Sequence, residues 1–277
     1  MKKQKNKSYL LISLILINVI TLTSCTNNEN TKDKYDIVIK NIEINEDNGR
    51  ALNLSSTEIL NISKNKNNKL EVSVDIKNRS KFDISNINFK YEEFDKNKNK
   101  IANSKTFSDI TLNPDDKAKI SFGHKEYTET IKITGYSYEV FDKIVFVDLV
   151  NDKVKIQENK YIVENSSDYE VLVVPSEKEI LASKKGNTYS INIVNSSDKD
   201  LGNVIVKVAQ INQDNEYTKV HNISANSVLK PLDDLNIEVT MLEDVKNIQV
   251  IGYSYDDLRL KSNITINLKS HQVKMEK

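Results

Sequence analysis

Apolar and polar residues alternate along most of the chain after position 35, with the two-residue period of a half-buried β-strand. The clearest runs are 72–77 and 87–91, in which Val, Ile, Phe and Tyr alternate with polar side chains. Clusters of Asn, Asp, Ser and Lys bound these runs, as turns bound strands. After residue 24 no run of apolar residues at helical spacing stands out. We therefore predict an all-β fold.

The chain also repeats itself. The segment 133–139 returns as 250–256, and Gly135 and Gly252 within it are 117 residues apart. The same offset of 117 keeps the strand-like positions in phase, and it relates Asn78 to Asn195, Ser80 to Ser197, Asn86 to Asn203, Pro114 to Pro231, Val74 to Ile191, and Phe89 to Val206. Further upstream, 58–60 matches 179–181 at an offset of 121. A repeat of this length has the size of a domain. We predict two tandem copies, 35–150 and 151–277, each a β-sandwich of about seven short strands.

The first 24 residues differ in character from the rest. Four lysines within the first seven residues precede a mostly Leu and Ile stretch from Tyr9 to Leu22. This is the pattern of a secretory signal peptide. The apolar stretch is shorter than the roughly 20 residues that a spanning helix needs.

The stretch ends in Leu22, Thr23, Ser24 and Cys25, and Cys25 is the only cysteine in the chain. These four residues resemble the lipobox of bacterial lipoproteins, at all four positions. The resemblance implies that Cys25 receives a diacylglycerol, that cleavage removes 1–24, and that the new amino group is acylated. Two or three acyl chains anchor a protein stably. The alternatives are a plain signal peptide with a chance cysteine, or a spanning anchor.

Composition predicts a tether after the cysteine and argues against nucleic acid as a partner. Residues 25–34 combine the cysteine with a segment that lacks apolar residues, which predicts a flexible tether. Without residues 1–24 the chain has 36 basic and 40 acidic side chains. This balance argues against nucleic acid, which needs a concentrated basic surface. No cysteine remains for a disulfide, so the core must hold the fold.

Each copy resembles the immunoglobulin-like modules of the FxLYD kind. The residues that carry the resemblance are Asn78-Arg79-Ser80, Ile84–Ile87 and Leu112-Asn113-Pro114, with Asn195-Ser196-Ser197, Leu201–Val204 and Leu229-Lys230-Pro231 in the second copy. The chain departs from the family at the motif that names it, since Val206–Asn212 lacks the aromatic-Asp pair of 89–95. The resemblance implies two tandem immunoglobulin-like β-sandwich domains. It implies no ligand or activity, because such modules are scaffolds.

Four tyrosines are the candidate binding residues: Tyr136 and Tyr138, with Tyr253 and Tyr255 in the second copy. One interpretation is an exposed aromatic strip that contacts sugar or peptide. The other is a bulge next to the glycine that turns both rings into the sandwich, with the hydroxyls reaching its rim. Recurrence in both copies favours the second interpretation, because a constraint of the fold acts on each copy equally.

No residues are predicted to be catalytic or to bind a metal or cofactor. Asp95–Asn99 begins like a calcium loop but lacks its glycine and its final glutamate, which indicates a hairpin turn. The acidic pairs 115–116 and 233–234 are interpreted as turn carboxylates, with an edge calcium site as the alternative. Three Ser-x-x-Lys patterns, at 63–66, 196–199 and 227–230, have no companion Lys-Thr-Gly.

We therefore expect a non-enzymatic binding or interaction module, held on the extracytoplasmic face of a bacterial cell membrane by the lipid on Cys25. Its partner would be an envelope protein, a peptide or a glycan. One alternative is a structural spacer of an envelope complex. Another is a hydrolase on the sandwich scaffold, which requires a deep cleft at the domain junction lined by carboxylates or by Ser with Lys.

Overall fold

The alternating segments form β-strands almost throughout. The computed structural model describes residues 43–62, 71–160, 162–163, 166–225, 227–241 and 245–276. The strands up to the middle of the chain are β1 Leu52–Leu54, β2 Glu58–Ile59, β3 Glu71–Asn78, β4 Ser85–Phe94, β5 Lys100–Ser108, β6 Lys117–Gly123, β7 Thr130–Val140, β8 Lys143–Asp148 and β9 Lys153–Glu158. Those that follow are β10 Ile162–Val163, β11 Leu172–Val173, β12 Thr188–Asn195, β13 Leu201–Asn212, β14 Tyr217–Ser224, β15 Asp234–Thr240, β16 Val245–Asp257, β17 Ser262–Asn267 and β18 Gln272–Glu276. The all-β prediction is confirmed.

The strands themselves repeat. β12 and β15 match β3 and β6 residue for residue at the offset of 117. β13, β14 and β16 match β4, β5 and β7 at the same offset, with ends that differ by at most two residues. β17 and β18 match β8 and β9 at an offset of 119, because the turn before β17 is two residues longer. We call the two sets the first and the second copy.

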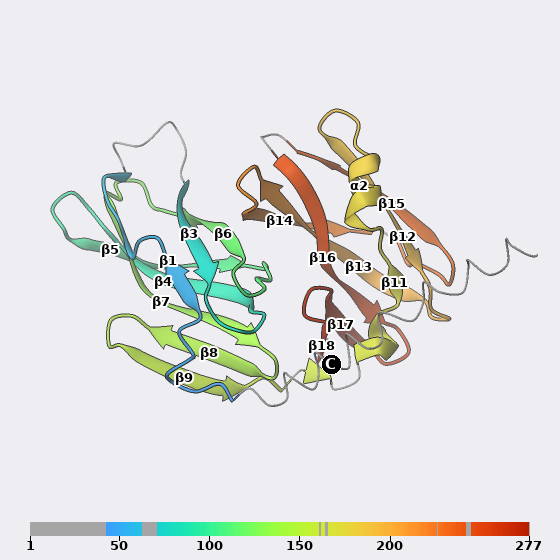
Figure 1. Ribbon diagram of the computed structural model, residues 1–277, viewed down its shortest axis with the longest axis horizontal. Helices are drawn as coiled ribbons and strands as arrows, with labels where there is room; N and C mark the ends of the chain where they lie inside the picture. Colours follow the sequence, from blue (N-terminus) through green and yellow to red (C-terminus); the bar gives the residue numbers. More distant parts are fainter. Residues whose placement is uncertain are drawn as a thin grey trace, which may run out of the picture. The chain divides into compact units, whose positions relative to one another are not determined.

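Each copy places a three-stranded sheet against a larger one (Figure 1). In the first copy, β1-β3-β6 accompanies β5-β4-β7-β8-β9. In the second copy, β11-β12-β15 accompanies β14-β13-β16-β17-β18-β10. One parallel bridge, between Ala118 of β6 and Tyr217 of β14, joins the small sheet of the first copy to the large sheet of the second. The result is a continuous nine-stranded sheet that both copies share.

Side chains from the two sheets of each copy fill the space between them. In the first copy, Phe122 of β6 packs 5.5 Å from Phe89 and 5.1 Å from Tyr91 of β4, measured between ring centroids. In the second copy, buried residues of β12 and β15 share one cluster with those of β13, β16 and β17. This packing is a β-sandwich, as predicted. Residues 44–277 group into one compact unit, so the two-domain division near 150 stays a prediction.

Two buried asparagines fix the turns at matching places. Asn78 and Asn195 are fully buried at the ends of β3 and β12. The Asn78 amide donates to the carbonyls of Phe82 and Leu112, both at 2.9 Å. The Asn195 amide donates to those of Lys199 at 2.8 Å and Leu229 at 3.0 Å. Each amide thus ties the strand end to two turns of its own copy.

One short helix lies among the described strands. α2 Glu177–Ala182 begins at Ser176, whose hydroxyl and amide exchange hydrogen bonds with Glu179 in a capping box. A 3-10 turn, Ser166–Tyr169, precedes it. The upstream sequence match at offset 121 is therefore not a structural one, since 58–59 forms strand β2 while 179–181 is helical. Within the described ranges, neither length nor composition allows any helix to cross a bilayer.

Candidate functional site

The four candidate tyrosines lie in the two sandwich cores. Tyr136 is 4 % exposed, and Tyr138, Tyr253 and Tyr255 are fully buried. In each copy the two rings stack, with centroids 6.3 Å apart in β7 and 6.4 Å apart in β16. Rings placed in this way do not form an exposed aromatic strip. The structural interpretation of the repeated segment is the one that the burial supports.

A bulge beside the glycine produces this burial. Lys90 of β4 lies opposite Gly135 and its neighbour Tyr91 lies opposite Ile133, so Thr134 is an extra residue in β7. Before the bulge, Ile133 faces the core, and after it Tyr136 does. The second copy has the same bulge at position 251 of β16. A one-residue insertion reverses which face of a strand is buried, which brings both tyrosines inward.

Glycine is required at the bulge because another strand passes close by. A Cβ at Gly135 would lie 2.6 Å from the carbonyl oxygen of Val147 in β8. At Gly252 the corresponding oxygen, that of Ile266 in β17, would be 2.5 Å away. Both distances fall inside van der Waals contact. The two glycines therefore allow the neighbouring backbone to pack directly onto the bulge.

The tyrosine hydroxyls bind backbone groups at the rim. Tyr138 donates to the carbonyl of Gly49 at 2.8 Å, and Tyr255 donates to that of Tyr169 at 3.1 Å. The Tyr253 hydroxyl accepts from the amide of Leu172 at 3.2 Å. Burial raises the pKa of Tyr253 to about 12 and raises the pKa values of the other three rings as well. The phenols therefore stay neutral in the fold at physiological pH.

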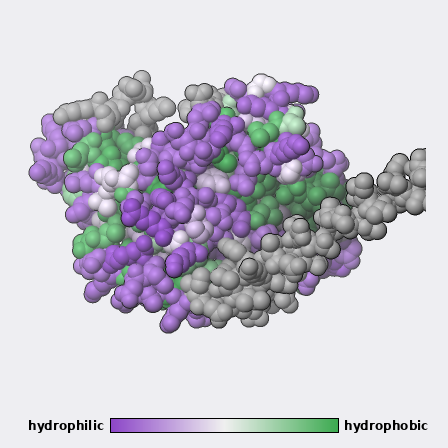
Figure 2. Space-filling model, in the orientation of Figure 1, coloured by the Kyte–Doolittle hydropathy of each residue, from purple (hydrophilic) through white to green (hydrophobic). Residues whose placement is uncertain are grey.

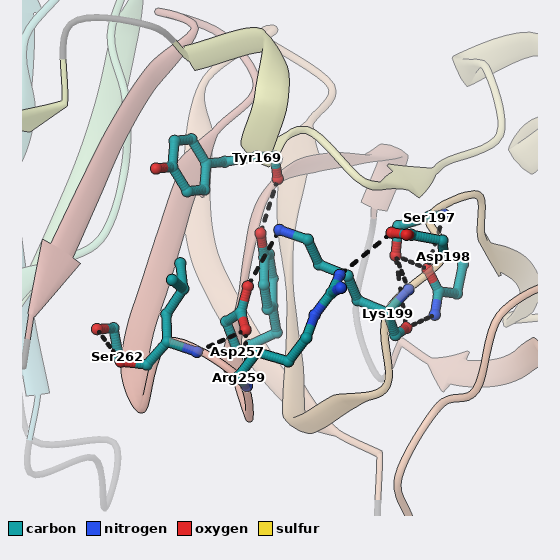
Figure 3. A network of polar contacts seen from close by, with 10 residues as sticks. Tyr169, Ser197, Asp198, Lys199, Asp257, Arg259 and Ser262 are labelled. Atoms are coloured by element: carbon teal, nitrogen blue, oxygen red, sulfur yellow. Dashed lines mark hydrogen bonds and ion pairs between the residues drawn. The ribbon is translucent and has the colours of Figure 1, made fainter.

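A polar network in the second copy, which the sequence did not nominate, links three loops (Figure 3). The Lys199 ammonium, between β12 and β13, lies 3.1 Å from a carboxylate oxygen of Asp257 at the end of β16. The other oxygen of Asp257 accepts from the amides of Arg259 at 2.9 Å and Leu260 at 3.0 Å. At the edge, the Arg259 guanidinium lies 3.2 Å from Asp198.

The charge in this network is satisfied within the fold. The Asp257 side chain is 1 % exposed and that of Lys199 is 23 % exposed. Burial alone would raise the pKa of Asp257, but the Leu260 amide, the Lys199 ammonium and the Arg259 amide lower it below its usual value. An open hollow of about 500 Å³ adjoins the carboxylate, and its lining consists of Asp256, Asp257, Leu258, Lys261, Ser262, Asn263 and Glu276.

The equivalent positions in the first copy are apolar. At the offset of 117, Lys199 corresponds to Phe82 and Asp257 to Val140, which are 4 % and 0 % exposed. The ion pair of the second copy therefore occupies the positions at which the first copy has two buried apolar residues. This exchange argues that Lys199 and Asp257 hold the fold together. Ser196 of the Ser-x-x-Lys pattern donates its hydroxyl to the carbonyl of Val171 at 2.9 Å, while Lys199 is paired with Asp257.

We predict that Asp257→Val lowers the free energy of unfolding by about 2 kcal/mol, because it leaves the half-buried Lys199 ammonium without its partner. The double variant Lys199→Phe, Asp257→Val carries the residues of the first copy and should regain at least half of that loss. Urea unfolding with an unchanged m value measures both effects. A double variant that is less stable than Asp257→Val would show that the two positions are not interchangeable.

A buried carboxylate in the first copy was also not predicted. Glu93 of β4 is 1 % exposed. Its oxygens accept from the Ser104 hydroxyl at 2.5 Å and from the Lys125 amide and Thr128 hydroxyl, both at 2.7 Å. Burial would raise the pKa of Glu93, but these three donors outweigh it and lower the pKa. The carboxylate is thus held ionised as a structural acceptor, and the second copy has Gln210 in its place.

The acidic turns hold their own backbones. Asp95 accepts from the amides of Asn97 and Asn99, both at 2.8 Å, which confirms the hairpin turn between β4 and β5. Asp116 accepts from the Asn113 amide at 3.0 Å, and Asp233 accepts from the Lys230 amide at 2.9 Å. Across the described part of the chain, no cluster of three or more His, Cys, Asp or Glu could hold one metal ion.

Charged and polar side chains join the two copies. The Lys269 ammonium, after β17, lies 2.7 Å from Asp116, donates to the Thr111 carbonyl at 3.1 Å and sits 4.3 Å from the centre of the Tyr217 ring. The Asn267 amide donates to the Thr111 hydroxyl at 2.6 Å.

Two further ion pairs cross the junction. Lys207 of β13 lies 3.3 Å from Asp109, and Lys274 of β18 pairs with Glu139 of β7. A hollow of about 30 Å³ remains beside these groups, which is space for about one water molecule. Ligand sites for small molecules are usually at least ten times larger. Cys25 and the rest of the lipobox lie outside the described residues.

Comparisons with known proteins identify no relative. No protein-family model and no curated protein matches the chain. Among solved structures, a red sea bream transglutaminase is matched at 9 % identity and a TM-score of 0.18, over 91 % of this chain and 34 % of that one. An Amycolatopsis orientalis exo-chitosanase is matched at 11 % identity and a TM-score of 0.18, over 73 % and 25 % of the two chains. The chain thus spans about a third or less of these proteins, and TM-scores this low support no conclusion about fold or activity.

Proposed function

We propose that this chain is a bacterial lipoprotein that acts as a non-enzymatic binding module on the extracytoplasmic face of the cell membrane. The observation that carries the proposal is the run Leu22-Thr23-Ser24-Cys25, placed between an apolar segment and a polar one. Diacylglycerol on the Cys25 thiol and an acyl chain on its amino group would anchor the protein, since each buried CH₂ contributes about 0.8 kcal/mol.

The folded part suits presentation of a surface rather than a buried reaction centre. We assign its two copies to immunoglobulin-like domains, on the Asn-x-Ser and Leu-x-Pro elements of each copy and on the pairing of three strands with six in each copy. Such domains bind through strand edges and end loops. On the face shown in Figure 2, hydrophilic side chains predominate and hydrophobic ones form separate patches. An envelope protein, a peptide or a wall glycan is the proposed partner.

Replacing the lipidated thiol tests the anchor. We expect Cys25→Ala to move the protein from the membrane fraction to the soluble fraction, because no acyl chain can be attached. Ser24→Ala is the matched control, since it keeps a small residue at that position and should leave the protein in the membrane. Fractionation with immunoblotting measures both, and the intact mass of the membrane form should exceed that of residues 25–277 by the acyl groups. If Cys25→Ala stays in the membrane fraction, the lipid anchor is wrong.

A further inference from the structure

The junction between the two copies uses only half of the surfaces that could form it. It joins β6, at the end of the small sheet of the first copy, to β14, at the end of the large sheet of the second. Their equivalents at the offset of 117 are β15 and β5. Among the strands that the structure describes, β15 and β5 are each the last strand of their sheet. We propose that a second copy of this chain docks there, with its β15 beside β5 of the first, in the way that β14 lies beside β6.

The exposed fractions of equivalent residues show that the surfaces around β15 and β5 are not covered within the chain. Thr111, which receives Lys269 and Asn267 across the junction, is 2 % exposed, whereas its equivalent Val228 is 47 % exposed. Tyr217 is 9 % exposed, whereas its equivalent Lys100 is exposed. The same positions are therefore buried where a neighbouring copy exists and open where none exists within the chain.

The chemistry of the open surfaces is apolar as well as polar. Val228 and Leu232, before β15, are 47 % and 81 % exposed, and Phe107 of β5 is 55 % exposed. Leu232 has φ of 65°, a conformation that suits the Asp115 of the first copy better than a leucine. The apolar side chain of Leu232 can leave water only if a partner covers it. An edge strand such as β5, which also carries an exposed aromatic ring, can pair with a strand of another chain.

Charge is complementary between the two edges. β5 carries Lys100 and Lys105 and no acid, whereas β15 carries Asp234 and Glu238 and no base. Lys105 lies directly opposite Lys90 on β4, a like-charge arrangement that is unfavourable in isolation.

In the second copy, Lys207 and Asn222 are equivalent to Lys90 and Lys105, and both bind an acidic residue. Lys207 and Asn222 both contact Asp109 of the neighbouring copy, at 3.3 and 3.4 Å. The residue equivalent to Asp109 is Asn226, which lies outside the described residues, so the acids would come from β15 itself. Lys155 and Asp256 stand at the positions equivalent to Lys274 and Glu139, so both signs of charge are kept there.

The proposed contact is heterologous, because β15 and β5 are different surfaces. After pairing, one chain keeps a free β15 and the other keeps a free β5, so association continues beyond the dimer unless a ring closes. At the register of the observed bridge, Leu235 would lie opposite Lys100 and Glu238 opposite Asn103, two residues from Lys105. Long side chains reach diagonal neighbours across that separation.

Charge reversal on one edge at a time tests the proposal. The full chain, solubilised in a neutral detergent, is followed by sedimentation velocity across a hundredfold range of concentration. We expect the unaltered chain to form dimers and then larger species, and 0.5 M NaCl to weaken them by screening. Lys105→Glu alone and Glu238→Lys alone should each weaken association at least tenfold. An equimolar mixture of the two variants should recover it. In the mixture, the carboxylate introduced on β5 of one variant meets the ammonium introduced on β15 of the other, and the unaltered edges form the native pair.

The controls separate this contact from others. Lys178→Glu reverses an exposed charge on α2 and should leave association unchanged, and circular dichroism verifies that every variant is folded. A chain that stays monomeric at all concentrations overturns the proposal. So does an unaffected Glu238→Lys variant, which would indicate a symmetric contact between two β5 strands, or a mixture that fails to recover.

Discussion

Asn195→Ala is expected to lower the free energy of unfolding by about 3–4 kcal/mol, although it removes no charge and little volume. The amide of Asn195 donates two hydrogen bonds, and its carbonyl oxygen accepts from the amide of Ser197 at 3.0 Å and its hydroxyl at 2.7 Å. Without the side chain, the half-buried carbonyl of Lys199 and the buried carbonyl of Leu229 each lose a donor, and the Leu229 carbonyl keeps only the Leu201 amide at 3.0 Å. An unpaired buried acceptor costs about 1–3 kcal/mol.

Asn78→Ala should have the same cost in the first copy, since Ser80 and two carbonyls take the equivalent places. Asn236→Ala is the matched control, because Asn236 is exposed and accepts only from the Ser190 hydroxyl at 2.7 Å. It should cost less than about 1 kcal/mol. Urea unfolding measures all three. A loss below 1 kcal/mol in Asn195→Ala would contradict the bridging role, and separate transitions shifted by Asn78→Ala and Asn195→Ala would establish two independent domains.

Alkaline pH is expected to unfold the protein cooperatively between about pH 10 and 12. The pKa of an exposed tyrosine in the unfolded chain is about 10, whereas burial raises the pKa of Tyr253 to about 12. The folded state therefore binds more protons than the unfolded state above pH 10, and stability falls as pH rises. Below pH 10 these rings are protonated in both states, so they add no pH dependence to the free energy of unfolding.

The size of the effect follows from the number of rings. One group with these two pKa values removes about 2 kcal/mol by pH 11.5, at 1.4 kcal/mol per pH unit. Burial raises the pKa values of Tyr136, Tyr138 and Tyr255 as well, so these rings add to the loss of stability in the same direction. Absorbance at 295 nm, recorded beside far-ultraviolet circular dichroism, should show ionisation and unfolding at one midpoint. Tyr127→Phe is the control, since that ring is 74 % exposed and should leave the midpoint unchanged. Ionisation of the buried rings near pH 10 in a protein that keeps its circular dichroism would contradict the argument.

The strand pattern and the repeat made most of the fold predictable. Alternation located the strands, and the offset of 117 matched β12 and β15 to β3 and β6 without a gap. The bulge was also predictable, because the buried positions change phase at Gly135 in a segment that recurs. Helix α2 was missed because six residues are too short for an apolar period, although Ser176 and Glu179 form a recognisable capping pair.

Tertiary contacts were beyond the sequence pattern. The repeat paired Asn78 with Asn195, but alternation could not show that both amides turn inward and reach two turns. The join of β6 to β14 depends on Asp109, Asp116 and their lysine partners, which lie more than 90 residues away along the chain. Comparing the copies position by position would have revealed that Phe82 and Val140 become Lys199 and Asp257.

That replacement also affects how the chain sorts its own strands while it folds. Two similar copies in one polypeptide can exchange equivalent strands and become trapped in mixed sandwiches. If β16 took the place of β7, Asp257 would be buried near Phe82 with no cation beside it. If β7 took the place of β16, the Lys199 ammonium would meet Val140. Each wrong assortment therefore buries an unpaired charge, whereas the native one does not, so the ion pair makes each copy select its own strand.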